Sequence, residues 1–203
     1  MNSQVEDIKV IREMMERSSK FLSLSGLSGV AAGVTAILGA AFAYFYLLRD
    51  PGATDYNSFQ ESLILLADAL VVLVLSLGIG FYMSWRKAQR NGAGLFNKVT
   101  YRILYSLAVP LVAGGIFCMI YLLKGDIRTV IAATLIFYGL ALVNASKYTY
   151  GEIHYLGLTE IVLGLLAAVF GRCGLLIWTL GFGVCHVLYG LVMHFKYDAR
   201  RNG

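Results

Sequence analysis

The sequence is poor in charge and in proline. Asp, Glu, Lys and Arg make up 14% of its 203 residues, whereas soluble domains carry about 25%. Hydrophobic residues make up 58%, and the mean hydropathy is +0.69. Two prolines beside 22 glycines are more typical of closely packed helices than of a disordered tail. A chain with so little polar surface is expected to form one membrane domain without a separate soluble module.

Cysteine is also scarce, and its pattern argues against two kinds of scaffold. The three cysteines, Cys118, Cys173 and Cys185, lie in or beside apolar segments. An odd number without metal-ligand spacing favours neither a disulfide framework nor a zinc site. Because Cys118 and Cys173 are both predicted near the outer face, the sequence does not exclude a single disulfide bridge between them. The sequence predicts no cofactor.

Known catalytic motifs are missing too. The sequence has no P-loop, no GxSxG nucleophile elbow, no DxxxD pair and no dinucleotide fingerprint. Its loops are short, and the longest on the outer side covers residues 49–62. An enzyme would need its site inside the bundle, so catalysis is not the function that we expect.

Long apolar runs are what the sequence does contain. Crossing a bilayer takes about 20 residues, with a range of about 17 to 25, and six runs qualify. They cover residues 21–48, 63–83, 103–123, 130–146, 153–170 and 175–195. Their continuous apolar character favours helices over barrel strands, which would alternate polar and apolar residues. The predicted fold is an all-α, polytopic bundle of six transmembrane helices.

The distribution of basic residues predicts the orientation. Arg49, Lys124, Arg128 and Arg172 lie on one side of the predicted spans, and all 13 others of the 17 lysines and arginines lie on the opposite side. The positive-inside rule then places both termini in the cytoplasm. The net charge of +5 follows from this topology and favours contact with anionic lipid. It is no sign of nucleic-acid binding, because no soluble domain carries a basic patch with interleaved aromatics.

The N-terminal segment predicts a short amphipathic helix over residues 1–20. Val5, Ile8, Ile11 and Met15 recur at helical spacing, and Ser3 with Glu6 forms a capping box. Such a helix lies on the lipid surface or docks on a partner. Residues 14–29, MMERSSKFLSLSGLSG, resemble the opening of small multi-span bacterial inner-membrane proteins. The resemblance covers only this helix and the start of the first span. It implies a bacterial inner-membrane setting but neither an activity nor a functional residue.

Two acidic residues, Asp68 and Glu160, fall well inside predicted spans. A charge at the centre of a membrane helix costs at least about 2.5 to 3.5 kcal/mol. Gly157 and Gly164 share the helical face of Glu160, so that face is expected to point into the bundle. His186, near the middle of the last span, could stand between the two carboxyl groups. The three form a candidate path for protons or a small cation; alternatively, each fixes helix packing through hydrogen bonds.

Other polar residues gather where the fourth span ends. Asn144, Lys147, Tyr148, Glu152 and His154 could line an inner vestibule for a solute, or could form an ordinary wet turn. A metal or haem site there stays open as well, although no HxxxH or HExxH spacing supports it.

Small residues mark the predicted helix contacts. Ser25, Gly29 and Gly33 form a stripe on the first span, typical of a centrally packed helix or of a seam between copies. A short pattern also repeats: Gly80-x-x-Met83 in the second span recurs as Gly190-x-x-Met193 in the sixth, each followed by two basic residues at matching positions. The repeat suggests two related hairpins or a chance likeness of helix ends.

Together these features rank three functions. Movement of a proton, small ion or small solute through the bundle stands first. A regulatory or scaffold protein, acting through the N-terminal helix and the basic 85–102 connection, is the alternative. A membrane metal or haem protein is third. The bilayer, a second copy and an unknown ion or solute are the partners that the sequence suggests.

Overall fold

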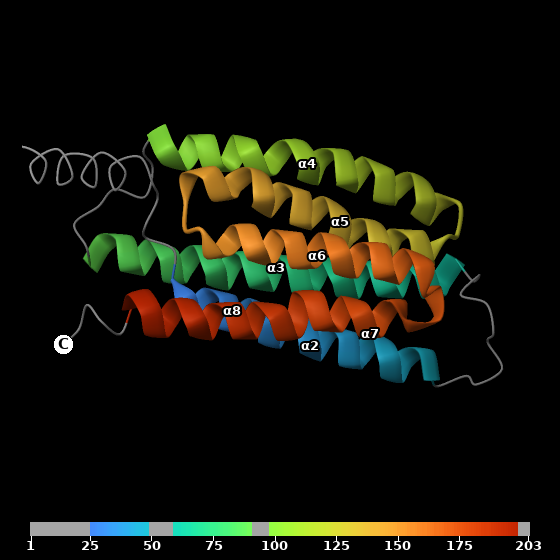
Figure 1. Cartoon of the computed structure of the whole chain (residues 1–203). Coiled ribbons are helices and arrows are strands. Elements are labelled where there is room, and N and C mark those ends of the chain that lie inside the picture. The colour runs from blue at the N-terminus through green and yellow to red at the C-terminus, as the bar shows by residue number, and fades with distance from the viewer. Residues whose placement is uncertain (1–24, 49–58, 91–97, 199–203) are drawn as a thin grey trace, which may run out of the picture.

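A computed structural model describes residues 25–48, 59–90 and 98–198. The predicted amphipathic helix 1–20 and the middle of the basic connection lie outside these residues. All regular structure in the described part is helical, which confirms the all-α prediction (Figure 1). Six helical stretches are long and apolar enough to cross a membrane.

The first five stretches are single helices. They are α2 (Gly26–Leu48), α3 (Phe59–Arg90), α4 (Lys98–Leu123), α5 (Ile127–Ala145) and α6 (Glu152–Val169). A 3₁₀ turn, Ser146–Tyr148, follows α5. Two helices extend beyond their predicted spans on the side of the basic connection. Helix α3 continues through Trp85–Arg90, and α4 already begins with Lys98–Arg102. Helix α4 also runs unbroken through Pro110.

The sixth stretch, Gly171–Tyr197, is composite. It joins a 3₁₀ turn (Gly171–Cys173), α7 (Gly174–Trp178), a π-helical segment (Thr179–Cys185), α8 (His186–Met193) and a second π-helical segment (His194–Asp198). A π-helical segment widens the helix and changes which side chains share a face, and such segments are frequent at functional sites. We call this composite stretch the sixth span.

The helices pack in a defined order. Helix α2 lies between α3 and the sixth span, the sixth span contacts α6, and α5 lies between α6 and α4 (Figure 1). Helices α3 and α4 therefore have the fewest neighbours. Large apolar side chains remain exposed along both, such as Val74 and Leu77 on α3 and Val112 and Ile116 on α4. Apolar bands of this kind mark a surface made for lipid or for another protein.

Glycines allow the closest helix contacts. A Cβ atom at Gly33 would lie 2.6 Å from the carbonyl oxygen of Gly183, and one at Gly29 would lie 3.1 Å from the Cα atom of Gly190. The stripe predicted on the first span thus faces the sixth span, and Ser25 at its start is buried. Small residues permit this backbone approach because no side chain separates the helices.

A second glycine contact joins α5 to α6. A Cβ atom at Gly157 would lie 2.8 Å from the carbonyl oxygen of Gly139, and one at Gly164 would lie 2.6 Å from the Cγ1 atom of Ile136. The predicted glycine face of α6 therefore packs against α5. This contact fixes the rotation of α6 and, with it, the direction of Glu160.

The turn between α4 and α5 is closed by a short capping motif. Gly125 adopts a positive φ of 76°, which suits glycine. Asp126 then caps α5: its Oδ1 accepts from the backbone N–H of Thr129 at 3.1 Å, and its Oδ2 accepts from the Thr129 hydroxyl at 2.6 Å. These two hydrogen bonds hold the pKa of Asp126 below its ordinary value of 3.8.

Replacing Asp126 with alanine should lower the free energy of unfolding by about 1 kcal/mol at neutral pH, the usual loss for an N-cap. Because the folded-state pKa is lowered, the stabilisation by Asp126 is present above pH 3.8 and is lost as the pH falls through the folded-state value. Thermal unfolding in detergent at neutral and at acidic pH measures the difference. Asp126→Asn, which keeps an acceptor, should lose less. An equal loss at both pH values would contradict the assignment.

All three cysteines are free. The bridge between Cys118 and Cys173 that the sequence left open is therefore not formed.

Candidate functional site

Glu160 is the most deeply buried ionisable residue of α6, with 0% of its surface exposed. Its carboxyl group points at Gly181 in the π-helical segment of the sixth span. A Cβ atom at position 181 would lie 2.5 Å from Oε2 of Glu160 and 2.7 Å from Cδ2 of Leu135. Glycine at this position therefore makes the room that the carboxyl group occupies.

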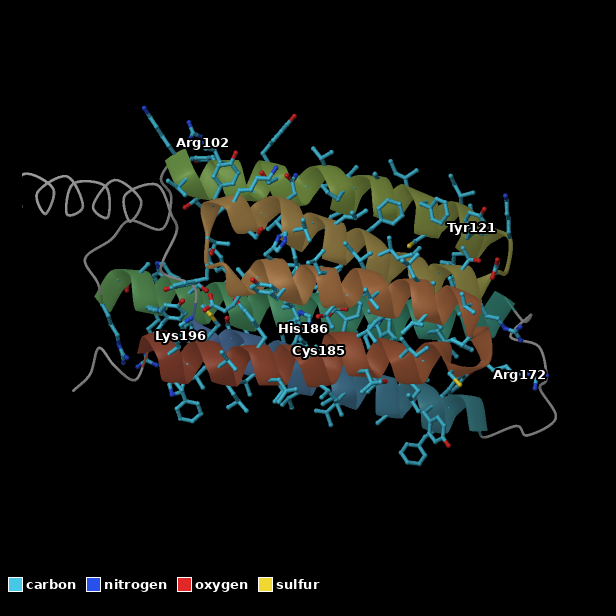
Figure 2. All side chains as sticks on the ribbon, viewed as in Figure 1. Arg102, Tyr121, Arg172, Cys185, His186 and Lys196 are labelled. Atoms are coloured by element: carbon cyan, nitrogen blue, oxygen red, sulfur yellow. The ribbon has the colours of Figure 1, made fainter. Side chains whose placement is uncertain are left out.

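His186 is the first residue after the π-helical segment, and it lies about halfway along the bundle (Figure 2). Its Nδ1 atom is 3.0 Å from the carbonyl oxygen of Gly181 and 3.4 Å from Oε1 of Glu160. A carbonyl oxygen only accepts hydrogen bonds, so Nδ1 must carry a proton. The imidazole is thus held by a backbone carbonyl that lies five residues before it in the widened helix.

The other ring nitrogen of His186 meets a tyrosine. Nε2 lies 2.8 Å from the hydroxyl oxygen of Tyr138 on α5. In the neutral ring with its proton on Nδ1, Nε2 accepts and the Tyr138 hydroxyl donates. Phe182 lines the same space, with ring centroids 5.0 Å from Tyr138 and 5.9 Å from His186. We call Tyr138, His186 and Glu160 the buried triad.

The carboxyl group of Glu160 is unusual because neither of its oxygens has a hydrogen-bond partner among the described residues. The approach of His186 is within ion-pair distance but is not a hydrogen bond. Two arrangements satisfy the charges: a protonated carboxyl beside a neutral imidazole, or a carboxylate beside an imidazolium. They differ by the place of one proton, so the buried triad can bind and pass a proton.

Asp68 belongs to another helix contact. A Cβ atom at Gly39 of α2 would lie 3.5 Å from both carboxyl oxygens of Asp68. Further along the same contact between α2 and α3, the hydroxyls of Thr35 and Ser76 lie 2.7 Å apart. Of the three residues in the predicted path, the structure brings His186 and Glu160 together and places Asp68 elsewhere.

The predicted vestibule residues lie where α5 ends and α6 begins. Asn144 donates to the backbone oxygen of Ser106 at 3.0 Å and ties α5 to α4. Lys147 and Tyr148 lie in the 3₁₀ turn, and Nδ1 of His154 is 3.4 Å from the Ser146 hydroxyl. These contacts are local.

Glu152 differs from its neighbours because it reaches the sixth span. Its Oε1 accepts from Nζ of Lys196 at 2.5 Å and from the hydroxyl of Tyr197 at 2.9 Å. We call Glu152, Lys196 and Tyr197 the end cluster. It joins the first turn of α6 to the last turn of the sixth span, and Figure 2 labels Lys196 at this end of the bundle.

A metal centre finds no support in the part of the chain that the structure describes, where no three His, Cys, Asp or Glu side chains come together. Residues that sequence reasoning missed are Tyr138 and Gly181. A signal for Tyr138 existed, since a buried tyrosine in an apolar span needs a partner for its hydroxyl. No signal in the sequence indicated Gly181, because the room that this glycine leaves for the Glu160 carboxyl group depends on the π-helical geometry.

Comparison with known proteins does not extend this description: no family model, no curated protein and no solved structure matches the chain.

Proposed function

We propose that this chain is a multi-pass protein of a bacterial inner membrane, with both termini in the cytoplasm, that moves protons through its bundle. The buried triad is its proton-binding site. The exposed apolar bands on α3 and α4 support residence in lipid, because water would not favour them.

One observation carries the proposal. Glu160 has no exposed surface and no hydrogen-bond partner among the described residues, yet an imidazole stands 3.4 Å away. A carboxyl that served only to fix packing would be expected to have its oxygens hydrogen-bonded, as buried polar groups almost always do. A carboxyl that binds and releases a proton gains from a neighbouring imidazole, because the imidazole can take up a proton at one ring nitrogen and give one up at the other.

The chemistry runs through three groups in contact. The step starts from the carboxylate of Glu160 beside the neutral imidazole. When Nε2 of His186 takes the proton of Tyr138 or of a water that replaces it, the proton on Nδ1 can move to Oε1 of Glu160. The carboxyl group then holds one proton more, and the imidazole stays neutral with its proton on Nε2. Any group that gave up its hydroxyl proton must be reprotonated from one end of the bundle.

Two alternative functions have less support from the described residues. A small cation could take the place of the proton, although the described residues place few oxygen ligands around Glu160. A regulatory or scaffold role through the N-terminal helix concerns residues outside the described part.

Proton flux into proteoliposomes tests the proposal. Wild-type protein should carry a flux, driven by a potassium diffusion potential, that clearly exceeds the flux of empty liposomes. Glu160→Gln should reduce the flux to that of empty liposomes. Asp68→Asn is the matched control, since it removes a carboxyl from another helix contact, and it should leave most of the flux. Background flux in all three preparations, or loss only in Asp68→Asn, would contradict the proposal.

A further inference from the structure

The two halves of the bundle on either side of the buried triad differ in polarity. Toward Arg172 the interior is a cluster of Ala132, Leu135, Ala167 and Ile177, with Trp178 and Phe182 packed against it. The hydroxyls of Thr134 and Thr179 lie in this half, but each donates to a carbonyl of its own helix, at 2.7 and 2.8 Å. Among the described residues, no member of this cluster carries a group that would pass a proton. The carboxyl group of Asp68 also lies toward this end, but in the separate contact between α2 and α3.

Toward Lys196 the interior contains a tyrosine hydroxyl. Tyr189 follows His186 by three residues on α8, a rise of about 4.5 Å. Its ring packs against Leu142, Ile153 and Leu156. The hydroxyl oxygen is buried and has no hydrogen-bond partner among the described residues. An unsatisfied buried hydroxyl costs about 1 to 3 kcal/mol, so an ordered water is the expected partner.

Tyr189 also connects the two polar groups already described. Tyr138 of the buried triad packs against the same apolar cluster as Tyr189, and Tyr189 lies between His186 and the end cluster along the sixth span. Beyond Tyr189, the ring centroids of Tyr150 and Tyr197 lie 4.4 Å apart with the rings tilted by 38°, and the Lys196 side chain is 53% exposed. Polar groups therefore continue from the middle of the bundle to its surface on this side.

We infer that in the conformation described here the buried triad exchanges its proton with the Lys196 end, through the hydroxyl of Tyr189 and bridging water, and that release toward Arg172 requires a different packing of the apolar half. The inference rests on the proposed function, since it names the side from which that site is loaded. In each step a hydroxyl accepts one proton from the Lys196 side and gives up its own toward Tyr138. Nε2 of His186 then gains a proton, and Nδ1 passes one to Glu160.

Infrared spectroscopy of oriented proteoliposomes tests the side of access without any reagent having to enter the bundle. The carboxyl band of Glu160 is assigned by its absence in Glu160→Gln. Two preparations are needed, one with the Lys196 end facing the bath and one with the Arg172 end facing it. With the lumen strongly buffered, a step in bath pH should change the band faster in the first preparation than in the second.

The variants sharpen this test. Tyr189→Phe should slow the response by at least about tenfold, as expected when a proton-transfer group is removed. Tyr155→Phe is the control, since Tyr155 lies on α6 near the same end but is 72% exposed, and it should respond like wild type. An equally fast response from both ends, a faster response from the Arg172 end, or no response from either end would overturn the inference.

The outcome separates the inference from the proposed function. Flux that depends on Glu160, together with a band that responds faster from the Arg172 end, would refute only the side of access. A band that responds from the Lys196 end without any flux would leave a one-sided proton site and refute transport.

Discussion

Replacing Glu160 with methionine is expected to make the protein more stable while it removes the proton site. Methionine has an unbranched side chain of about the same length as glutamate and a somewhat larger volume, so the space opposite Gly181 stays filled. The substitution removes a carboxyl group that is fully buried and whose oxygens have no hydrogen-bond partner in the described structure. Exchanging buried charged groups for apolar ones of similar size is often neutral or stabilising, by about 1 to 4 kcal/mol.

The rest of the site should tolerate this change. Nδ1 of His186 keeps its hydrogen bond to the carbonyl oxygen of Gly181, and Nε2 keeps the hydroxyl of Tyr138. No buried polar group is therefore left without the partner that it has now. A thioether near the rings of Tyr138 and Phe182 is also a favourable neighbour for aromatic side chains.

Thermal and denaturant unfolding in detergent, wild type beside Glu160→Met, measure the effect. Glu152→Met is the matched control on the same helix. Glu152 is hydrogen-bonded to Lys196 and Tyr197, so its loss should not stabilise the protein. If Glu160→Met instead unfolds as readily as a variant with a truncated core side chain, the carboxyl group fixes packing and the proposed function loses its main support.

The sequence was sufficient for the helical class and for the position of the apolar helices, because run length alone limits what can cross a bilayer. It was less accurate at the helix ends. Helix α3 continues past its predicted end through Trp85, and α4 begins at Lys98, before its predicted start. Hydrophobicity does not mark such ends, since charged residues remain helical once they leave the apolar layer.

For the site, the sequence indicated how far along its helix each candidate residue lies but not which residues it contacts. Glu160 and His186 were candidates because the bilayer penalises polar groups, and the structure puts them together. Asp68 was a candidate by the same argument, yet it lies against α2. A helical position fixes how far a residue lies along the axis, whereas the neighbour depends on which helices pack together and on their rotation.

The π-helical segment is the part that sequence reasoning could not supply. Periodicity assumes 3.6 residues per turn, and the widened turns of Thr179–Cys185 shift every later residue relative to the earlier ones. His186 therefore meets Glu160 through a geometry that a regular helix would not have given. Nothing in the composition of this glycine-rich segment distinguishes it from an ordinary tightly packed span.

The repeated Gly-x-x-Met pattern provides the second large prediction, because its two glycines have opposite surroundings. A Cβ atom at Gly80 on α3 would meet nothing within 4 Å. One at Gly190 on α8 would lie 2.7 Å from the backbone oxygen of Gly26, and closer still to the backbone nitrogen of Val30. The two positions match in sequence pattern but not in packing, which argues against equivalent hairpins.

Gly190→Ala should therefore lower the free energy of unfolding by about 1 to 3 kcal/mol or more, as overpacking does. Gly80→Ala should raise it by about 0.5 to 1 kcal/mol, since alanine is the better helix former. The added methyl at position 190 meets backbone atoms of α2, which no rotamer change can move. Trimming Val30 to alanine should consequently fail to rescue Gly190→Ala. Unfolding midpoints of the three variants in one detergent measure this, and either equal effects at the two glycines or full rescue by Val30→Ala would show that α2 and the sixth span do not meet as closely as described.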